Sequence, residues 1–136
     1  MIYTSNYARQ GKDENAYGIS CTIPDWFPSE RHLRLLAPTW DLVDAWKKKQ
    51  ITEAEYTQTY IQLITSRVNV ENILQAFSCN DDMYLLCYES PGQFCHRRVL
   101  AELIETHTSI CIPEWKNEKE QQQAKTAAFV DSIFDF

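Results

Sequence analysis

The sequence contains little glycine, only Gly11, Gly18 and Gly92. A dinucleotide-binding fingerprint needs three glycines at close spacing between a strand and a helix. These three residues stand far apart, which excludes a conventional Rossmann cofactor site, and we assign no cofactor to the chain. A phosphatase-type loop is missing as well, because counting its cysteine-to-arginine spacing from Cys87 reaches Gln93.

Long hydrophobic runs are absent too. No apolar stretch approaches the ~18–20 residues that span a bilayer, and residues 1–6 are too polar for a secretory signal. The cysteines form an odd set, which favours free thiols over a disulfide scaffold. They are Cys21, Cys79, Cys87, Cys95 and Cys111. These features predict a cytoplasmic protein with no membrane partner.

A positive net charge is also missing. The formal net charge is −6, so the chain is not expected to bind nucleic acid non-specifically, because phosphate binding depends on Lys and Arg. The 136 residues are 44% hydrophobic and 24% charged, which is ordinary for a globular protein. We expect one domain over residues 1–136, long enough to bury a core.

The order of the predicted elements favours an α/β fold. β-prone segments open the chain, helices fill the middle, and a strand–helix–strand pattern precedes a last helix. This order predicts a single compact, Rossmann-like domain with a small, mostly parallel sheet and flanking helices. The strands are expected at 2–5, 17–23, 83–88 and 109–112, and the helices at 40–49, 52–68, 70–77, from about 95, and 121–133.

Two helix starts carry clear capping residues. Thr39 can cap the helix that begins at Trp40, and Thr52 forms a capping box with Glu55. The segment between the first two strands, residues 8–14, is polar and is expected to be a loop. The apolar runs 83–88 and 109–112 suit strands that are buried on both faces.

One turn concentrates polar groups. Residues 85–105 read LLCYESPGQFCHRRVLAELIE, which predicts a buried strand, a tight turn and a helix that starts near Cys95. Ligands of open α/β sheets collect beyond the carboxyl ends of the strands. A helix N-terminus directs unpaired N–H groups into that space, and Arg97 would add a fixed positive charge. We therefore expect this turn to bind an anionic ligand.

The helical phase assigns directions to the motif side chains. The apolar stripe of this helix consists of Val99, Leu100, Leu103 and Ile104. His96 lies in the middle of this stripe, Arg97 on its flank and Arg98 almost opposite. We expect His96 to point inward, Arg97 to border the rim of the sheet and Arg98 to lie in solvent.

Three of these side chains are candidate catalytic groups. Glu89 is the candidate general acid or base, and Cys95 the candidate nucleophile or sensor, because a helix N-terminus beside Arg97 favours a thiolate. His96 would orient the reacting groups or carry a proton. Structural alternatives remain open: Cys95 as a small buried hydrophobe, His96 as a satisfied buried imidazole, and Arg97 in an ion pair with Glu89.

Two further features bear on ligands. Cys87, Cys95 and His96 are possible zinc ligands, but paired-cysteine spacing and a clear fourth ligand are missing, so we assign no metal. Trp26 and Phe27, in a loop between two prolines, and Tyr3, in the first strand, could form a stacking wall. The alternative for the two loop aromatics is that they cap the edge of a core.

The stretch LLCYESPGQFCHRRVLAELI resembles the hallmark segment of the domain-of-unknown-function 488 family. That segment is an apolar strand ending in Cys-x-Glu, a short turn with proline, and Cys-His-Arg opening a helix. IYTSNYA, ISCTIPDWF and LAPTWDLVDAWKKKQITEAEYTQTYI are similar to the short, single-domain members, so the likeness covers most of the chain. Many relatives carry a Gly-His pair at the end of the first strand, where this chain has Ser5 and Asn6.

The resemblance implies a compact α/β fold with the motif at one edge of the sheet, and no settled reaction. The residues that match the motif are Cys87, Glu89, Cys95, His96 and Arg97. Family members often occur in bacterial and viral genomes, which links the family to nucleotides or nucleic acid by association only.

Three hypotheses of different classes follow. The first is a small enzyme, or ligand-binding domain, acting on an anionic, nucleotide- or nucleic-acid-related small molecule at the Cys-His-Arg turn. The second is a non-catalytic interaction protein, such as a viral or mobile-element factor that blocks a host protein partner through an acidic surface and the aromatics around Trp26. The third is a thiol redox or metal protein.

Overall fold

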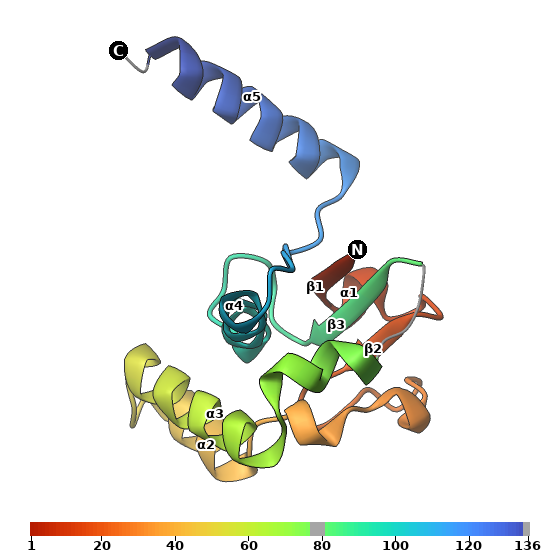
Figure 1. The fold of residues 1–136 in the computed structure, drawn as a ribbon, viewed down its shortest axis with the longest axis vertical. Helices are drawn as coiled ribbons and strands as arrows, with labels where there is room; N and C mark the ends of the chain where they lie inside the picture. The colour runs from red at the N-terminus through yellow and green to blue at the C-terminus, as the bar shows by residue number, and fades with distance from the viewer. Residues whose placement is uncertain (77–80, 135–136) are drawn as a thin grey trace.

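A central buried strand, β3 (Met83–Cys87), has a parallel neighbour on each side. β1 (Ile2–Asn6) pairs with it from Ile2 opposite Met83 to Asn6 opposite Cys87. β2 (Ala16–Gly18) pairs on the other side, with Tyr17 opposite Leu85. The computed structural model describes residues 1–76 and 81–134 (Figure 1). The expected α/β class and small parallel sheet are confirmed.

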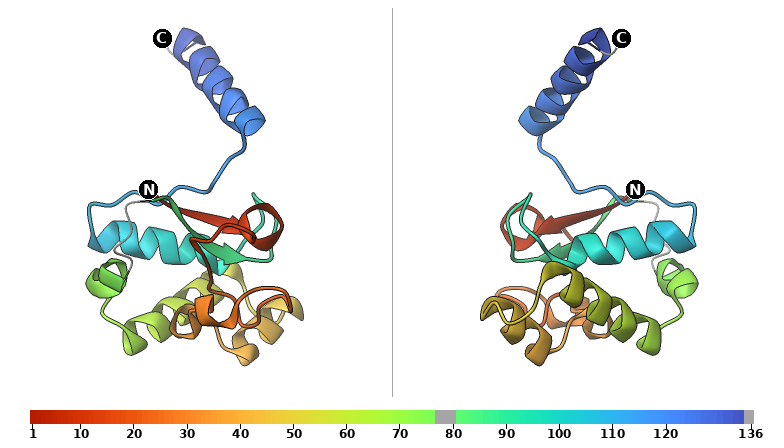
Figure 2. Two further views of the ribbon diagram at one scale, coloured as in Figure 1. Left: turned by 90° about the vertical axis from the view of Figure 1, so that its right-hand side faces the viewer. Right: turned by 90° about the vertical axis from the view of Figure 1, so that its left-hand side faces the viewer.

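Both faces of the sheet are covered, because β3 directs apolar side chains to each face in turn. Leu85 and Cys87 enter the larger core, which α2 (Trp40–Lys47), α3 (Glu53–Arg67) and α4 (His96–His107) complete. Tyr84 and Leu86 enter a smaller cluster on the other face. α4 packs against β1, β3 and α3, between the sheet and the other two helices (Figure 2).

The helix starts follow the capping residues of the sequence. Thr39 accepts a hydrogen bond from the backbone N–H of Leu42, and α2 begins at the next residue, Trp40. The capping box of Thr52 and Glu55 is complete, with both reciprocal hydrogen bonds present, and starts α3. Both predicted caps are confirmed.

Short 3₁₀ helices fill the connections. They are η1 (Ser29–Arg31), η2 (Arg34–Leu36) and η3 (Val70–Ala76). The third takes the place of the helix predicted over 70–77, and Phe77, like Cys79, lies outside the described residues. The expected loop at 8–14 begins with a short helix, α1 (Tyr7–Gln10), because the Asn6 side chain caps it by accepting from the N–H of Arg9.

The predicted strand over 109–112 is wrong. Ser109, Ile110 and Cys111 are exposed coil, and the backbone reaches β1 only beyond Ile112, at an isolated parallel bridge between Thr4 and Glu114. Proline at 113 has no N–H to donate, so a regular ladder cannot pass through it. The strand predicted over 17–23 is also shorter than expected, since β2 ends at Gly18.

The last helix, α5 (Glu118–Phe134), contains the predicted segment 121–133. It stands away from the body of the molecule (Figures 1 and 2). The side chains from Gln121 to Ile133 are all exposed. No helix in the described ranges is long and apolar enough to cross a membrane.

Replacing Thr52 by alanine should lower the free energy of unfolding by about 1 kcal/mol, because the N-cap bond to the Glu55 N–H is lost. Urea titration followed by circular dichroism measures this change. Thr59→Ala, at an exposed position within the same helix, is the control and should be neutral or slightly stabilising. Equal losses in the two variants would contradict the capping argument.

Candidate functional site

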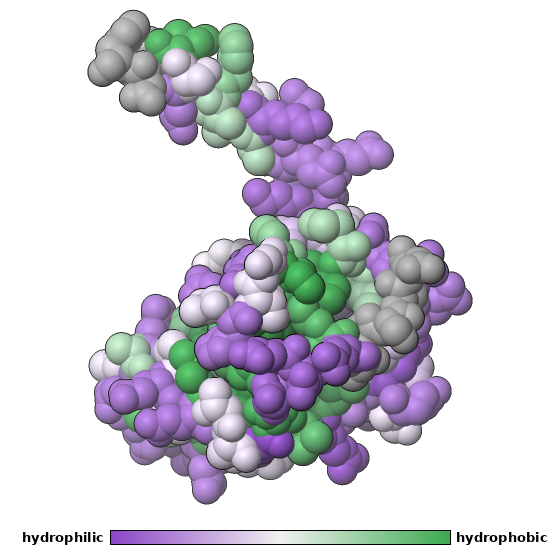
Figure 3. Space-filling view, viewed as in Figure 1, coloured by the Kyte–Doolittle hydropathy of each residue, from purple (hydrophilic) through white to green (hydrophobic). Residues whose placement is uncertain are grey.

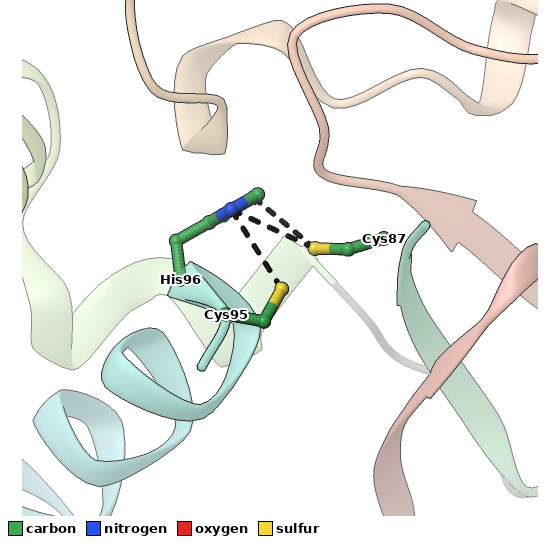
Figure 4. A group of neighbouring side chains, drawn as sticks. All are labelled: Cys87, Cys95 and His96. Carbon is green, nitrogen blue, oxygen red and sulfur yellow. Dashed lines mark hydrogen bonds between the residues drawn. The ribbon is translucent and has the colours of Figure 1, made fainter. Parts of the chain in front are cut away.

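The candidate site lies where β3 ends and α4 begins. The connecting turn contains Gly92 at φ 86°, a left-handed conformation that glycine adopts without strain. Cys95 occupies the N-cap position of α4, but its side chain makes no capping bond. Its sulfur is therefore available to the neighbouring groups, and Cys87, Cys95 and His96 point toward one another (Figure 4).

His96 points inward as expected and is buried. Its Nε2 lies 2.7 Å from the carbonyl oxygen of Ile19. A carbonyl can only accept, so Nε2 carries a proton and donates it to Ile19. The Cys87 sulfur lies 3.2 Å from Nε2 and 3.8 Å from Nδ1, and the Cys95 sulfur lies 3.9 Å from Nδ1. The imidazole is thus held between a backbone carbonyl and two thiols.

Glu89 and Cys95 interact directly. The Cys95 Sγ donates a hydrogen bond of 3.1 Å to Oε2 of Glu89. Burial and the nearby Cys95 raise the pKa of Glu89. Burial opposes ionisation of Cys95, but hydrogen bonds with Cys87 and His96 outweigh it and lower the pKa of this thiol.

The pKa of Cys87, the second thiol of the pair, shifts in the opposite direction. Complete burial, together with its hydrogen bond to Cys95, raises the pKa of the Cys87 thiol well above its ordinary value. Negative charge is therefore favoured on Cys95 and disfavoured on Cys87. The two sulfurs differ in their chemistry because Cys87 is completely buried, whereas Cys95 makes stabilising hydrogen bonds with Cys87 and His96.

The sequence predicts that Arg97 borders the rim of the sheet, but in the structure this side chain is enclosed. It is 1% exposed and forms a forked ion pair with Glu114, with distances of 3.0 and 2.7 Å. Its Nη1 donates to the backbone carbonyl of Glu89 at 2.9 Å. Burial opposes its charge, but the hydrogen bonds to Glu114 outweigh this and raise the pKa of Arg97. The expected partner was Glu89, but the carboxylate comes from Glu114.

Arg98 is not in solvent either. It is partly buried and donates from Nη1 to the hydroxyl of Thr4 and to the carbonyl of Ile112, both at 2.8 Å. The Thr4 hydroxyl in turn donates to Glu114 at 2.6 Å. The helical phase could not indicate this arrangement, because the segment that covers Arg98 returns from beyond the end of α4.

A cavity of about 220 Å³ opens on the other side of the turn, toward α2. Glu89 and His96 line it, together with Lys47, which lies at the end of α2. Its aromatic wall consists of Trp40, Trp46, Tyr56 and Tyr88. A larger, more apolar hollow of about 670 Å³ lies between η2 and η3 and is lined by no motif residue, so its size alone does not make it the site.

The three aromatics proposed from the sequence are not brought to this cavity. Tyr3 stacks on Tyr84 with ring centres 5.7 Å apart. Phe27 is buried against Tyr7 in the cluster on the opposite face of the sheet. Trp26 is 48% exposed, with the Lys12 ammonium 4.1 Å from its ring centre. Phe27 thus matches the alternative of capping the edge of a core.

Sequence reasoning missed the aromatic wall and Lys47. A signal for part of it was present, because Trp40, Val43 and Lys47 recur at helical spacing and therefore share one face of α2. All three line the cavity. No sequence pattern marks Glu114, which lies in irregular chain.

The fold and the site define a class of protein: a small α/β domain with two cysteines, a histidine and a carboxyl group at one strand-to-helix turn. Residues 2–108 match a family model described as "Active DUF488-N3 subclade". The chain therefore belongs to the domain-of-unknown-function 488 family, as the motif suggested. No curated protein and no solved structure matches it. The matched range ends before Glu114, so the ion-pair partner of Arg97 lies outside it.

Glu114→Gln should lower the free energy of unfolding by about 2–3 kcal/mol, because it leaves the buried Arg97 charge without its partner. Chemical denaturation measures this loss. Glu118→Gln, at an exposed position in α5, is the matched control and should change stability by less than about 0.5 kcal/mol. A Glu114→Gln variant as stable as the control would show that the pair does not hold this corner.

Proposed function

We propose that this protein binds, and acts on, a small anionic, nucleotide-like molecule in the cavity beside Glu89 and His96. The observation that supports this most is the composition of the cavity wall. A carboxyl group and an imidazole lie among four aromatic side chains, with a lysine at the edge. Aromatic walls with a few placed polar groups are typical of small-molecule sites.

The size of the cavity suggests how such a ligand would be placed. At about 220 Å³ it is smaller than the ~300–1,000 Å³ pockets of drug-sized ligands. One planar ring, such as a nucleobase, would fit between the aromatic side chains, while a sugar or phosphate stays outside. Trp40 is 60% exposed and offers an open ring face for stacking.

Lys47 would take the anionic group in this proposal. Arg97, the residue favoured by the sequence, is enclosed with Glu114 and does not line the cavity. Lys47 lines it from an exposed position. An ammonium on a flexible stem can follow a phosphate that moves with its ligand.

Glu89 is the proposed general acid or base, because its carboxyl group lines the cavity and is held by Cys95. Cys95 is 4% exposed and faces Glu89, so here it orients the carboxyl group and does not attack the ligand. His96 lines the cavity and can orient the bound ring. The word "active" in the description of the matched subclade supports a catalytic role.

We also infer that the protein works in a reducing compartment such as the cytoplasm. Cys21, Cys87, Cys95 and Cys111 are free thiols. Reducing conditions keep such thiols unpaired. The proposed role of Cys95 requires this state, because a sulfur in a disulfide could not share a proton with Glu89.

Trp40→Ala should weaken binding of nucleoside monophosphates about 10-fold, because one stacked base is worth ~1–3 kcal/mol. Thermal-shift screening of nucleobases, nucleosides and nucleotides, followed by calorimetry, measures this change. Trp26→Ala removes a comparably exposed tryptophan from the opposite face of the sheet and should leave binding unchanged. If no member of the panel stabilises the unmutated protein, the proposal is wrong.

A second candidate, a non-catalytic interaction protein, is favoured by α5. Phe129 is 65% exposed, and Val130 and Ile133 are exposed beside it on a helix that stands apart (Figures 1 and 3). Changing Phe129 and Ile133 to serine should leave the melting temperature and cavity binding unchanged, because neither side chain is buried. Loss of a partner retained by the unmutated protein in affinity capture would favour this function. Loss of that partner in Trp40→Ala instead would exclude α5 as its surface.

A further inference from the structure

Three metal-ligating side chains converge at the turn between β3 and α4. Cys87 comes from the end of the strand, Cys95 from the helix cap and His96 from the first helical position. All three are buried, and one ligand atom from each lies within 4.8 Å of the others (Figure 4). Neither paired-cysteine spacing nor a fourth residue marks this cluster in the sequence, and the fold alone assembles it.

We propose that Cys87, Cys95 and His96 hold a zinc ion whose fourth position is open toward the cavity. Zinc binding by these residues does not depend on the proposed function, whereas the use of the zinc in catalysis rests on it. Two thiolates and an imidazole suit zinc, while magnesium and calcium prefer oxygen ligands. Two cysteines, one histidine and a water molecule form a known catalytic zinc set.

The two sulfur-to-Nδ1 distances are close to those of tetrahedral zinc, but the direction of the Cys87 side chain is not. With Zn–S near 2.3 Å and Zn–N near 2.0–2.1 Å, the sulfurs of a tetrahedral site lie about 3.6 Å from the ligating nitrogen. The Cys87 and Cys95 sulfurs lie 3.8 and 3.9 Å from Nδ1. Cys87 lies closer to Nε2, at 3.2 Å, whereas a sulfur bound to zinc on Nδ1 lies farther from Nε2 than from Nδ1. Cys87 must therefore adopt a different rotamer when the ion binds.

The second nitrogen of His96 is already arranged as in a metal site. Nε2 donates its proton to the carbonyl of Ile19 at 2.7 Å, which leaves the lone pair on Nδ1. Metal-ligating histidines commonly donate their other N–H to a carbonyl or carboxylate, which fixes the tautomer and the ring orientation. The Tyr60 ring also packs against the imidazole in an edge-type contact, with ring centres 5.2 Å apart.

Charge balance also favours zinc in this buried position. Two thiolates and Zn²⁺ sum to zero, so the loaded centre carries no net charge, as buried ionic groups require. The two thiol protons leave to solvent when the ion binds. Cys95 then no longer donates to Glu89, and the carboxylate becomes free to accept a proton from a water molecule on the zinc.

The test starts from the protein of residues 1–136, purified with a thiol reductant, incubated with zinc and dialysed. Mass spectrometry of the metal content should find one zinc per chain, and none in Cys95→Ser or His96→Gln. Cys21→Ser is the matched control, because Cys21 lines the same cavity but lies outside the cluster, and it should keep the metal. Glu89→Gln should keep it as well, since the carboxyl group is not a ligand. Loss of zinc in Glu89→Gln would contradict the proposal that the fourth coordination position of the zinc is open.

Cobalt provides a measurement that needs no variant. Co²⁺ in the unmutated protein should give thiolate-to-cobalt absorption in the near ultraviolet and the intense visible bands of tetrahedral cobalt. Unmutated protein with no more zinc than Cys95→Ser, and no such bands, would overturn the proposal. Nucleotide binding by the chelator-treated protein separates the two ideas. Trp40-dependent binding without zinc would leave the proposed function standing, and zinc without nucleotide binding would leave only the metal site.

Discussion

The buried guanidinium of Arg97 joins three segments that lie far apart in the sequence. It donates two hydrogen bonds to the Glu114 carboxylate and a third to the backbone carbonyl of Glu89. A charge that is 1% exposed is tolerated only when a partner and hydrogen bonds compensate for the lost water. The first turn of α4, the end of the β3 turn and the segment beyond α4 must therefore fold as one unit.

This ion pair also gives the two sides of the turn different chemistry. Arg97, Arg98, Thr4 and Glu114 form a connected polar network on the β1 side. On the side of α2, Glu89 and His96 line a cavity among aromatic side chains. The same short turn thus has an ion-paired side and an aromatic side. Glu89 contributes to both sides of the turn: its backbone carbonyl accepts a hydrogen bond from Arg97 on the ion-paired side, and the residue lines the cavity on the aromatic side.

Several features of the site follow from the residues of the turn alone. The buried strand, the helix start beside Cys95 and the inward direction of His96 were predicted, because period-two and helical patterns report directly on burial. The side of the turn on which a ligand could lie was not predictable. It depends on which distant segments cover each side, and the strand expected at 109–112 gave no indication of Glu114.

The sequence by itself determined the order of the three paired strands and the main α-helices, the two capped helix starts and the presence of cysteine, glutamate and histidine at one turn. These properties are local, since each depends on neighbours within a few residues. Only the tertiary structure decided that Arg97 is enclosed, that α2 contributes to the aromatic wall and that two sulfurs lie beside the His96 imidazole. Those contacts join residues distant along the chain, and packing of the whole core, not any local pattern, sets their distances.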